Sequence, residues 1–133
     1  MFPRFMNPQR FELFGPHLNA GFAKSGSQKS LALYIGGMGA RDKNFYNDAA
    51  KRLGYEAAAI RIQDAFLAGR KAEAVAAVPD ALVDEIALVG SADRIRDRLQ
   101  AWKDARKQRH VDSMLLSGNV NTAALRVIAD AVL

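Results

Sequence analysis

The sequence predicts a mainly α-helical protein with one short strand, at about residues 111–117. Three observations favour this fold class. Apolar residues recur at helical spacing through most of the chain. Glycine or proline follows most of these stretches, where helices commonly end. Only one apolar run has the composition of a strand, and a lone strand needs a neighbour to pair its backbone groups.

The first thirty residues predict an interrupted helix followed by a polar loop. Asn7 is a typical N-cap, and Pro8 suits the first helical position. Gly15–Pro16 interrupts or restarts the helix, because proline cannot donate to the preceding turn. Residues 25–30 are polar, with Gly26 as a C-cap glycine, and predict a loop. The next run, Leu31–Ile35, is ambiguous between strand and helix by periodicity alone.

Four helices are predicted in the middle of the chain, and a helix-ending residue closes each of the first three. Gly54 and Gly69 suit the position just after a helix, and Pro79 cannot continue one. The fourth helix begins near Asp80 and directs apolar side chains inward. The predicted helices are residues 44–53, 55–68, 70–78 and the segment from 80 to about 86.

The C-terminal third predicts two more helices around the strand. Ser91 is an N-cap for a long amphipathic helix that reaches about Lys107. Its apolar stripe contains Ala92, Ile95, Leu99 and Trp102, and we expect Trp102 to belong to the core. The strand 111–117 ends at Gly118. A final helix begins at Asn121 or Thr122 and carries the apolar residues Leu125, Ile128, Ala129 and Val132.

Length and composition bound the functional classes. The 133 residues are expected to form a single domain, 1–133. No apolar run approaches the ~20 residues of a membrane-spanning helix. The absence of cysteine excludes disulfides and thiolate chemistry, and a cytoplasmic location fits. The net charge of +5 is compatible with nucleic acid, but acids interleave with the bases, so an ordinary basic surface is favoured.

The segment Leu31–Asp48 is the most distinctive in the chain. Three glycines fall within four residues at Gly36-Gly37-Met38-Gly39, a charged turn follows, and an aromatic helix start comes next. From here to the end, the order of motifs resembles the C-terminal portion of the luciferase-like oxidoreductases, (β/α)8 barrels that use FMN or a deazaflavin, coenzyme F-420. The glycine block resembles the turn after barrel strand seven. Leu88-Val89-Gly90 and Asp93–Leu99 resemble the segment that leads into the last crossover helix.

The resemblance also predicts that this barrel is incomplete. Residues 111–117 resemble strand eight, and residues 1–30 resemble the crossover helix that follows strand six. In the family, about one βα unit of ~30 residues separates these parts, whereas here Ser30 joins Leu31 directly. We therefore expect a helical C-terminal remnant of a barrel, truncated and internally deleted, in which Leu31–Ile35 is helical. The alternative is a distinct helical protein that shares these blocks.

The glycine block supplies the candidate binding residues. Glycines allow a phosphate or a flavin ring to approach the backbone, a basic side chain can bind an acidic cofactor tail, and an aromatic ring can line a pocket. A tight turn, solvated charges and packing are the favoured alternatives. The candidates are Gly36, Gly37, Gly39, Arg41, Lys43 and Tyr46. No catalytic triad or metal motif can be assembled, because His17 and His110 have no carboxylate at ligand spacing.

The resemblance implies oxidoreduction, by hydride transfer or monooxygenation, with FMN or deazaflavin. A barrel builds its site from the ends of many strands, and most are missing here. We therefore expect a chain without independent activity that does not bind the cofactor alone. The alternative is a helical module that associates with itself or with a barrel-type subunit. Nucleic-acid binding ranks last.

Overall fold

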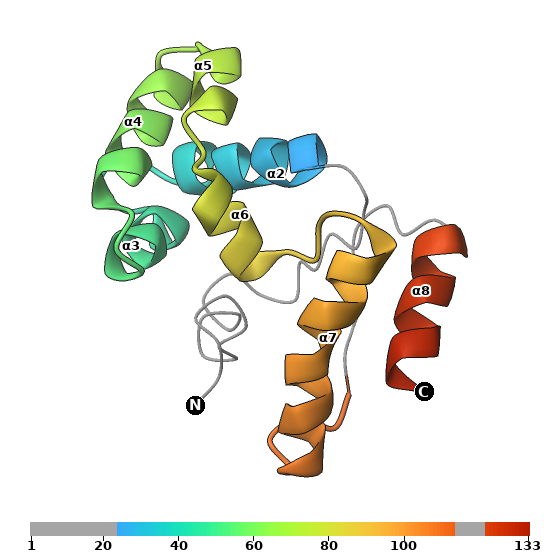
Figure 1. The fold of residues 1–133 in the computed structure, drawn as a ribbon. Coiled ribbons are helices and arrows are strands. Elements are labelled where there is room, and N and C mark those ends of the chain that lie inside the picture. The colour runs from blue at the N-terminus through green and yellow to red at the C-terminus, as the bar shows by residue number, and fades with distance from the viewer. Residues whose placement is uncertain (1–23, 114–121) are drawn as a thin grey trace. The chain divides into compact units, whose positions relative to one another are not determined.

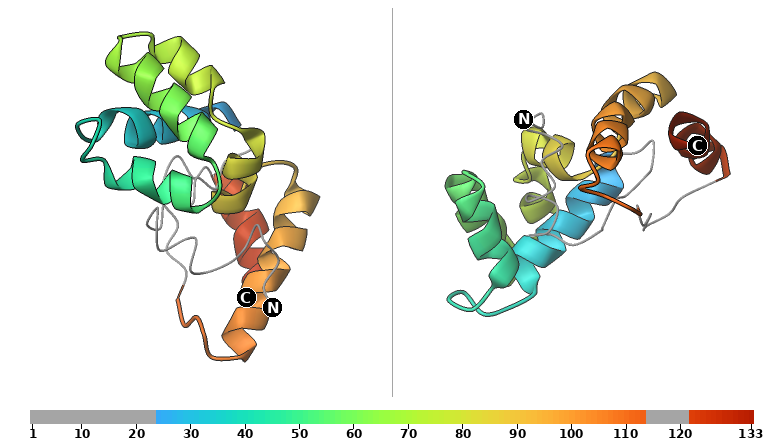
Figure 2. Two further views of the ribbon diagram at one scale, coloured as in Figure 1. Left: turned by 90° about the vertical axis from the view of Figure 1, so that its left-hand side faces the viewer. Right: turned by 90° about the horizontal axis from the view of Figure 1, so that it is seen from below.

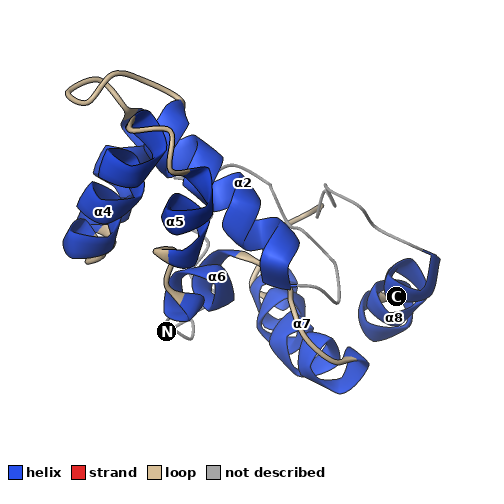
Figure 3. Cartoon of the chain, turned by 90° about the horizontal axis from the view of Figure 1, so that it is seen from above, coloured by secondary structure: helices blue, strands red, loops and turns tan. Residues whose placement is uncertain are grey.

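The computed structural model describes residues 24–113 and 122–133, and every regular element in these ranges is an α-helix (Figures 1 and 3). The mainly helical fold class is confirmed. The helices are α2 Lys24–Gly37, α3 Phe45–Arg52, α4 Glu56–Leu67, α5 Lys71–Ala76, α6 Asp80–Ile86, α7 Ala92–Lys107 and α8 Thr122–Val132. None of the described helices is long and apolar enough to cross a membrane.

The predicted helix ends in the middle of the chain are confirmed. The backbone is left-handed at Gly54 (φ +96°) and Gly69 (φ +79°), directly after α3 and α4. Glycine takes this conformation without the steric cost that a side chain adds. Ser91 caps α7, because its hydroxyl accepts a hydrogen bond from the backbone N–H of Arg94 at 3.3 Å.

The predicted loop at residues 25–30 is wrong, because these residues belong to α2. Ser27 and Leu31 are both buried and lie one helical turn apart, so continuing the helix keeps them on one face. A helical glycine such as Gly26 costs only about 1 kcal/mol relative to alanine. Packing of this face outweighs the local preference for a loop. The resemblance-based prediction that Leu31–Ile35 is helical is confirmed.

The predicted strand is not formed in its first three residues, Val111–Ser113, which have no regular structure. Its remaining residues, 114–117, lie outside the described part of the chain. All the predictions for residues 1–23 lie outside it as well.

Backbone contacts divide the described residues into two compact units. The first, residues 25–83, contains α2 to α5 and the start of α6. Within it, α3 packs against α4 and α4 against α5. Its buried apolar side chains come from all of these helices, and the largest fully buried ones are Ile35, Ile62, Leu82 and Val83.

The second unit, within residues 84–133, is organised by α7 and α8, which pack side by side (Figures 1 and 2). Its core cluster consists of Leu88, Ile95, Leu99 and Ile128. Trp102 packs against this cluster but remains partly exposed, so the expectation that it belongs to the core is met in part.

Candidate functional site

The glycine block lies where α2 ends and turns toward α3; we call residues 36–43 the glycine turn. Gly36 is buried against α4. A Cβ atom at this position would lie 2.6 Å from Phe66 Cβ and 3.1 Å from the carbonyl oxygen of Ile62. At Gly37, a Cβ atom would meet the ring of the same Phe66. These two glycines therefore let the end of α2 pack directly on α4.

Gly39 serves the turn itself. A Cβ atom here would meet the backbone of Lys43 and would lie 3.0 Å from Asn44 Cα. The turn is closed by an antiparallel bridge between Ala40 and Lys43, in which the Lys43 N–H donates to the Ala40 carbonyl at 3.0 Å. Gly39 thus makes room for protein backbone.

Asn44 joins the glycine turn to α3 and back to α2. Its Oδ1 accepts a hydrogen bond from the Asn47 N–H at 3.0 Å, which caps α3. Its Nδ2 donates to the carbonyl oxygens of Tyr34 at 3.2 Å and Ile35 at 3.0 Å. Those carbonyls belong to the last turn of α2, where intrahelical donors run out. One buried amide therefore caps the start of one helix and the end of another.

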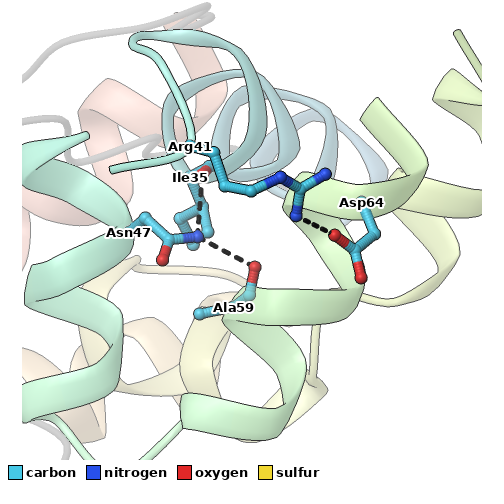
Figure 4. Close-up of polar contacts among 5 residues, drawn as sticks. All are labelled: Ile35, Arg41, Asn47, Ala59 and Asp64. Carbon is cyan, nitrogen blue, oxygen red and sulfur yellow. Dashed lines mark hydrogen bonds and ion pairs between the residues drawn. The ribbon is translucent and has the colours of Figure 1, made fainter. Parts of the chain in front are cut away.

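Asn47 extends this network to a third helix (Figure 4). It is buried on α3, and its Nδ2 donates to the carbonyl oxygens of Ile35 at 3.1 Å and Ala59 at 2.9 Å. The two acceptors fix the orientation of the amide, because the flipped form would place Oδ1 against both carbonyls. The sequence analysis did not identify Asn47. The available signal was an amide inside a predicted helix, where asparagine has low propensity.

The charged candidates project from the same turn. Arg41 forms an ion pair with Asp64 of α4 (Figure 4). Both side chains are largely exposed, so the ion pair adds little to the stability of the fold. The Lys43 side chain is exposed.

The aromatic candidate, Tyr46, packs against other rings. Its ring centroid lies 4.8 Å from that of Tyr34 and 5.5 Å from that of Phe45, in tilted and edge-on arrangements. Such pairs are favourable packing geometries. The structure thus brings all six candidates to one helix junction, where five of them contact the protein itself and Lys43 has an exposed side chain.

The electrostatic feature of the other unit is a carboxylate between two arginines. Oδ1 of Asp84 lies 2.9 Å from Nη2 of Arg94 and 3.4 Å from Nη1 of Arg98. Burial lowers the pKa of the Arg98 guanidinium, and the nearby Asp84 partly opposes this shift. The arrangement attaches the start of α7 to the end of α6. Among the described residues, no three His, Asp or Glu side chains converge as a metal site would require.

The glycine turn lies within a long segment of the chain that matches a known protein family. Residues 7–109 match the family model described as luciferase-like monooxygenase. The chain belongs to this family.

A relative from Mycobacterium tuberculosis (strain ATCC 25618 / H37Rv), named as a coenzyme F-420-dependent oxidoreductase, is 31% identical over 131 residues. The alignment covers 77% of this chain and 38% of the relative, so the chain spans about two fifths of that protein's length. The alignment is 131 positions long, but 77% of this chain is only about 102 residues. Roughly 29 positions of the alignment therefore contain no residue of this chain. No solved structure matches the chain.

Gly36→Ala tests the packing role of the glycine turn. We expect it to lower the free energy of unfolding by roughly 1–3 kcal/mol, because the new methyl group pushes α2 away from α4. Gly26→Ala is the matched control in the same helix, since a Cβ atom there meets nothing within 4 Å. It should stabilise by about 0.5–1 kcal/mol through helix propensity. Urea denaturation measures both, and equal effects would contradict the close-packing argument.

Proposed function

We propose that this chain is the C-terminal helical part of a luciferase-like oxidoreductase and that it does not carry out hydride transfer or monooxygenation alone. The family match and the partial coverage of the relative support this proposal. The observation that carries it is the all-helical structure of residues 24–113 and 122–133. A (β/α)8 barrel builds its active site at the C-terminal ends of its parallel strands, and the described residues supply no such strand end.

The cofactor of the intact proteins would be FMN or deazaflavin, which supplies the ring that exchanges a hydride. The glycine turn does not fit that group as it is arranged here. Phe66 occupies the space beside Gly36 and Gly37, and Arg41 is paired with Asp64. We therefore assign these residues no role in catalysis. We also place the chain in the cytoplasm, since its lack of cysteine fits a reducing compartment.

Cofactor titration tests the proposal. We expect neither FMN nor coenzyme F-420 to bind saturably at concentrations up to about 1 mM, a threshold that corresponds to about −4 kcal/mol. Fluorescence of the added cofactor measures this. Lys43→Ala serves as the matched variant, because Lys43 is the charged candidate without an ion pair in the described residues. A yellow protein that retains stoichiometric flavin through gel filtration would contradict the proposal.

A second candidate function is association with another copy or with a barrel-type subunit. Several large apolar side chains of the described residues face solvent, which is typical of interaction surfaces when they gather in one place. They are Leu33, Met38, Phe45, Ile60, Leu67, Leu125 and Leu133. Light scattering over a concentration series tests this function, and a monomer at every concentration would exclude self-association.

A further inference from the structure

We propose that a hollow between the C-terminal part of α7 and the end of α8 binds a small aromatic carboxylate; we call it the α7–α8 hollow. It has a volume of about 100 Å³ and opens to solvent. Its apolar lining comes from Trp102, Val111 and Val132. The hollow belongs to the α7–α8 unit, whereas the glycine turn belongs to the unit of residues 25–83.

The size of the α7–α8 hollow limits the apolar part of the ligand to about one ring. A closed apolar cavity of about 150 Å³ admits benzene. A smaller hollow that opens to solvent therefore takes most of one ring and leaves the substituent of that ring outside. Trp102 is partly buried and gives the ring an aromatic surface to pack against. The same size excludes the three fused rings of a flavin.

Two cations at the rim of the hollow favour an anionic substituent. Lys103 and Arg106 line the hollow, and both residues are exposed. Arg106 is four residues after Trp102, so the two side chains lie on the same face of α7. Neither cation forms an ion pair with another described residue. A guanidinium can donate two parallel hydrogen bonds to one carboxylate.

The nearby acids do not neutralise both of these cations. Asp104 follows Trp102 by two residues and therefore faces another side of α7. There its carboxylate lies 3.5 Å from Lys107 Nζ and accepts a hydrogen bond from Gln100 at 3.0 Å. Among the described lining residues, Asp112 is the one acid. Two cations and one carboxylate leave the rim with a net charge of +1, which attracts an anion.

Benzoate tests the site in the full chain, with benzamide as its uncharged match. Trp102 is the single tryptophan of the sequence, so its indole N–H gives one NMR signal that reports on the hollow. We expect benzoate to shift this signal saturably, with a dissociation constant of about 1–10 mM, and benzamide to bind about tenfold more weakly. Equal binding of the two compounds would overturn the charge argument. A signal that benzoate does not shift saturably up to about 50 mM would overturn the site.

Lys103→Gln and Arg106→Gln test the rim, with Lys107→Gln as the matched control. Lys107 is also an exposed cation near the end of α7, but it is paired with Asp104 and is not among the residues that line the hollow. Each rim variant should weaken benzoate binding about fivefold or more, and the control about twofold or less. Circular dichroism should show unchanged helix content for all three. A control that weakens benzoate as much as the rim variants would overturn the proposal, because overall charge would then explain the binding.

Discussion

Asn47→Ala is expected to lower the free energy of unfolding by roughly 1–3 kcal/mol. The substitution removes the amide that donates to the Ala59 carbonyl oxygen and that shares the Ile35 carbonyl oxygen with Asn44. The amide is buried, with 1% of the residue exposed, so water does not readily replace these donors. Each buried polar group left without a partner costs ~1–3 kcal/mol. Alanine recovers only a few tenths of a kcal/mol through its higher helix propensity.

Two further variants separate the hydrogen bonds from other effects of the substitution. Asn47→Asp keeps the shape but replaces the donors with a carboxylate oxygen that faces two carbonyls, so it should destabilise at least as strongly. Asp48→Ala, on the exposed side of the same helix, should change stability by about 1 kcal/mol or less. Urea denaturation followed by circular dichroism measures each. If Asn47→Ala costs no more than Asp48→Ala, the amide does not hold the three helices together.

Leu99→Ala is expected to cost roughly 2–5 kcal/mol, the usual range when a buried leucine is emptied. Leu99 is 0% exposed and belongs to the cluster with Leu88, Ile95 and Ile128. Trp102→Ala should fall at or below the lower part of that range, because the indole also lines an open pocket and is only partly buried.

Leu67→Ala is the control for this series, since that residue is already 48% exposed. Its cost should stay near or below 1 kcal/mol. Thermal unfolding followed by circular dichroism measures all three variants. If Trp102→Ala proved more damaging than Leu99→Ala, the core of this unit would be centred on the indole instead of on Leu99.

Helix ends were the most predictable part of the fold, because their signals are local. Ser91 caps the helix that follows it, and Gly54 and Gly69 close the helices before them. Each signal depends on side-chain and backbone atoms a few residues apart. Such contacts form in nearly the same way whatever the rest of the chain does.

Features that depend on distant contacts were not predictable in the same way. The polar residues 25–30 predict a loop when only their neighbours in sequence are considered. They belong to α2 because the buried face of that helix continues through them. The final helix carries apolar residues on two faces, and only the structure shows that Ile128 is buried while Leu125 is exposed. Periodicity shows that a face is apolar, but it does not identify what covers the face.

The candidate site shows the same division. The sequence favoured a tight turn as the role of Gly36-Gly37-Met38-Gly39. Gly39 lies beside such a turn, closed by the Ala40–Lys43 bridge, whereas Gly36 and Gly37 belong to α2 and pack on α4. It did not identify Asn47, because the acceptors of this amide lie twelve residues away on either side, in two other helices. Nothing in a single sequence marks which carbonyls will converge on one side chain.

The backbone at the end of α7 contains a conformation that lowers the stability of the chain. Arg109 adopts φ +58° just after the helix, and the His110 N–H donates to the Ala105 carbonyl at 3.0 Å to close its last turn. A side chain in this left-handed conformation costs roughly 1–2 kcal/mol relative to glycine. Proteins under selection need only enough stability to remain folded, so such costs persist where they do no harm. Replacing Arg109 with glycine would therefore remove this cost and raise the free energy of unfolding.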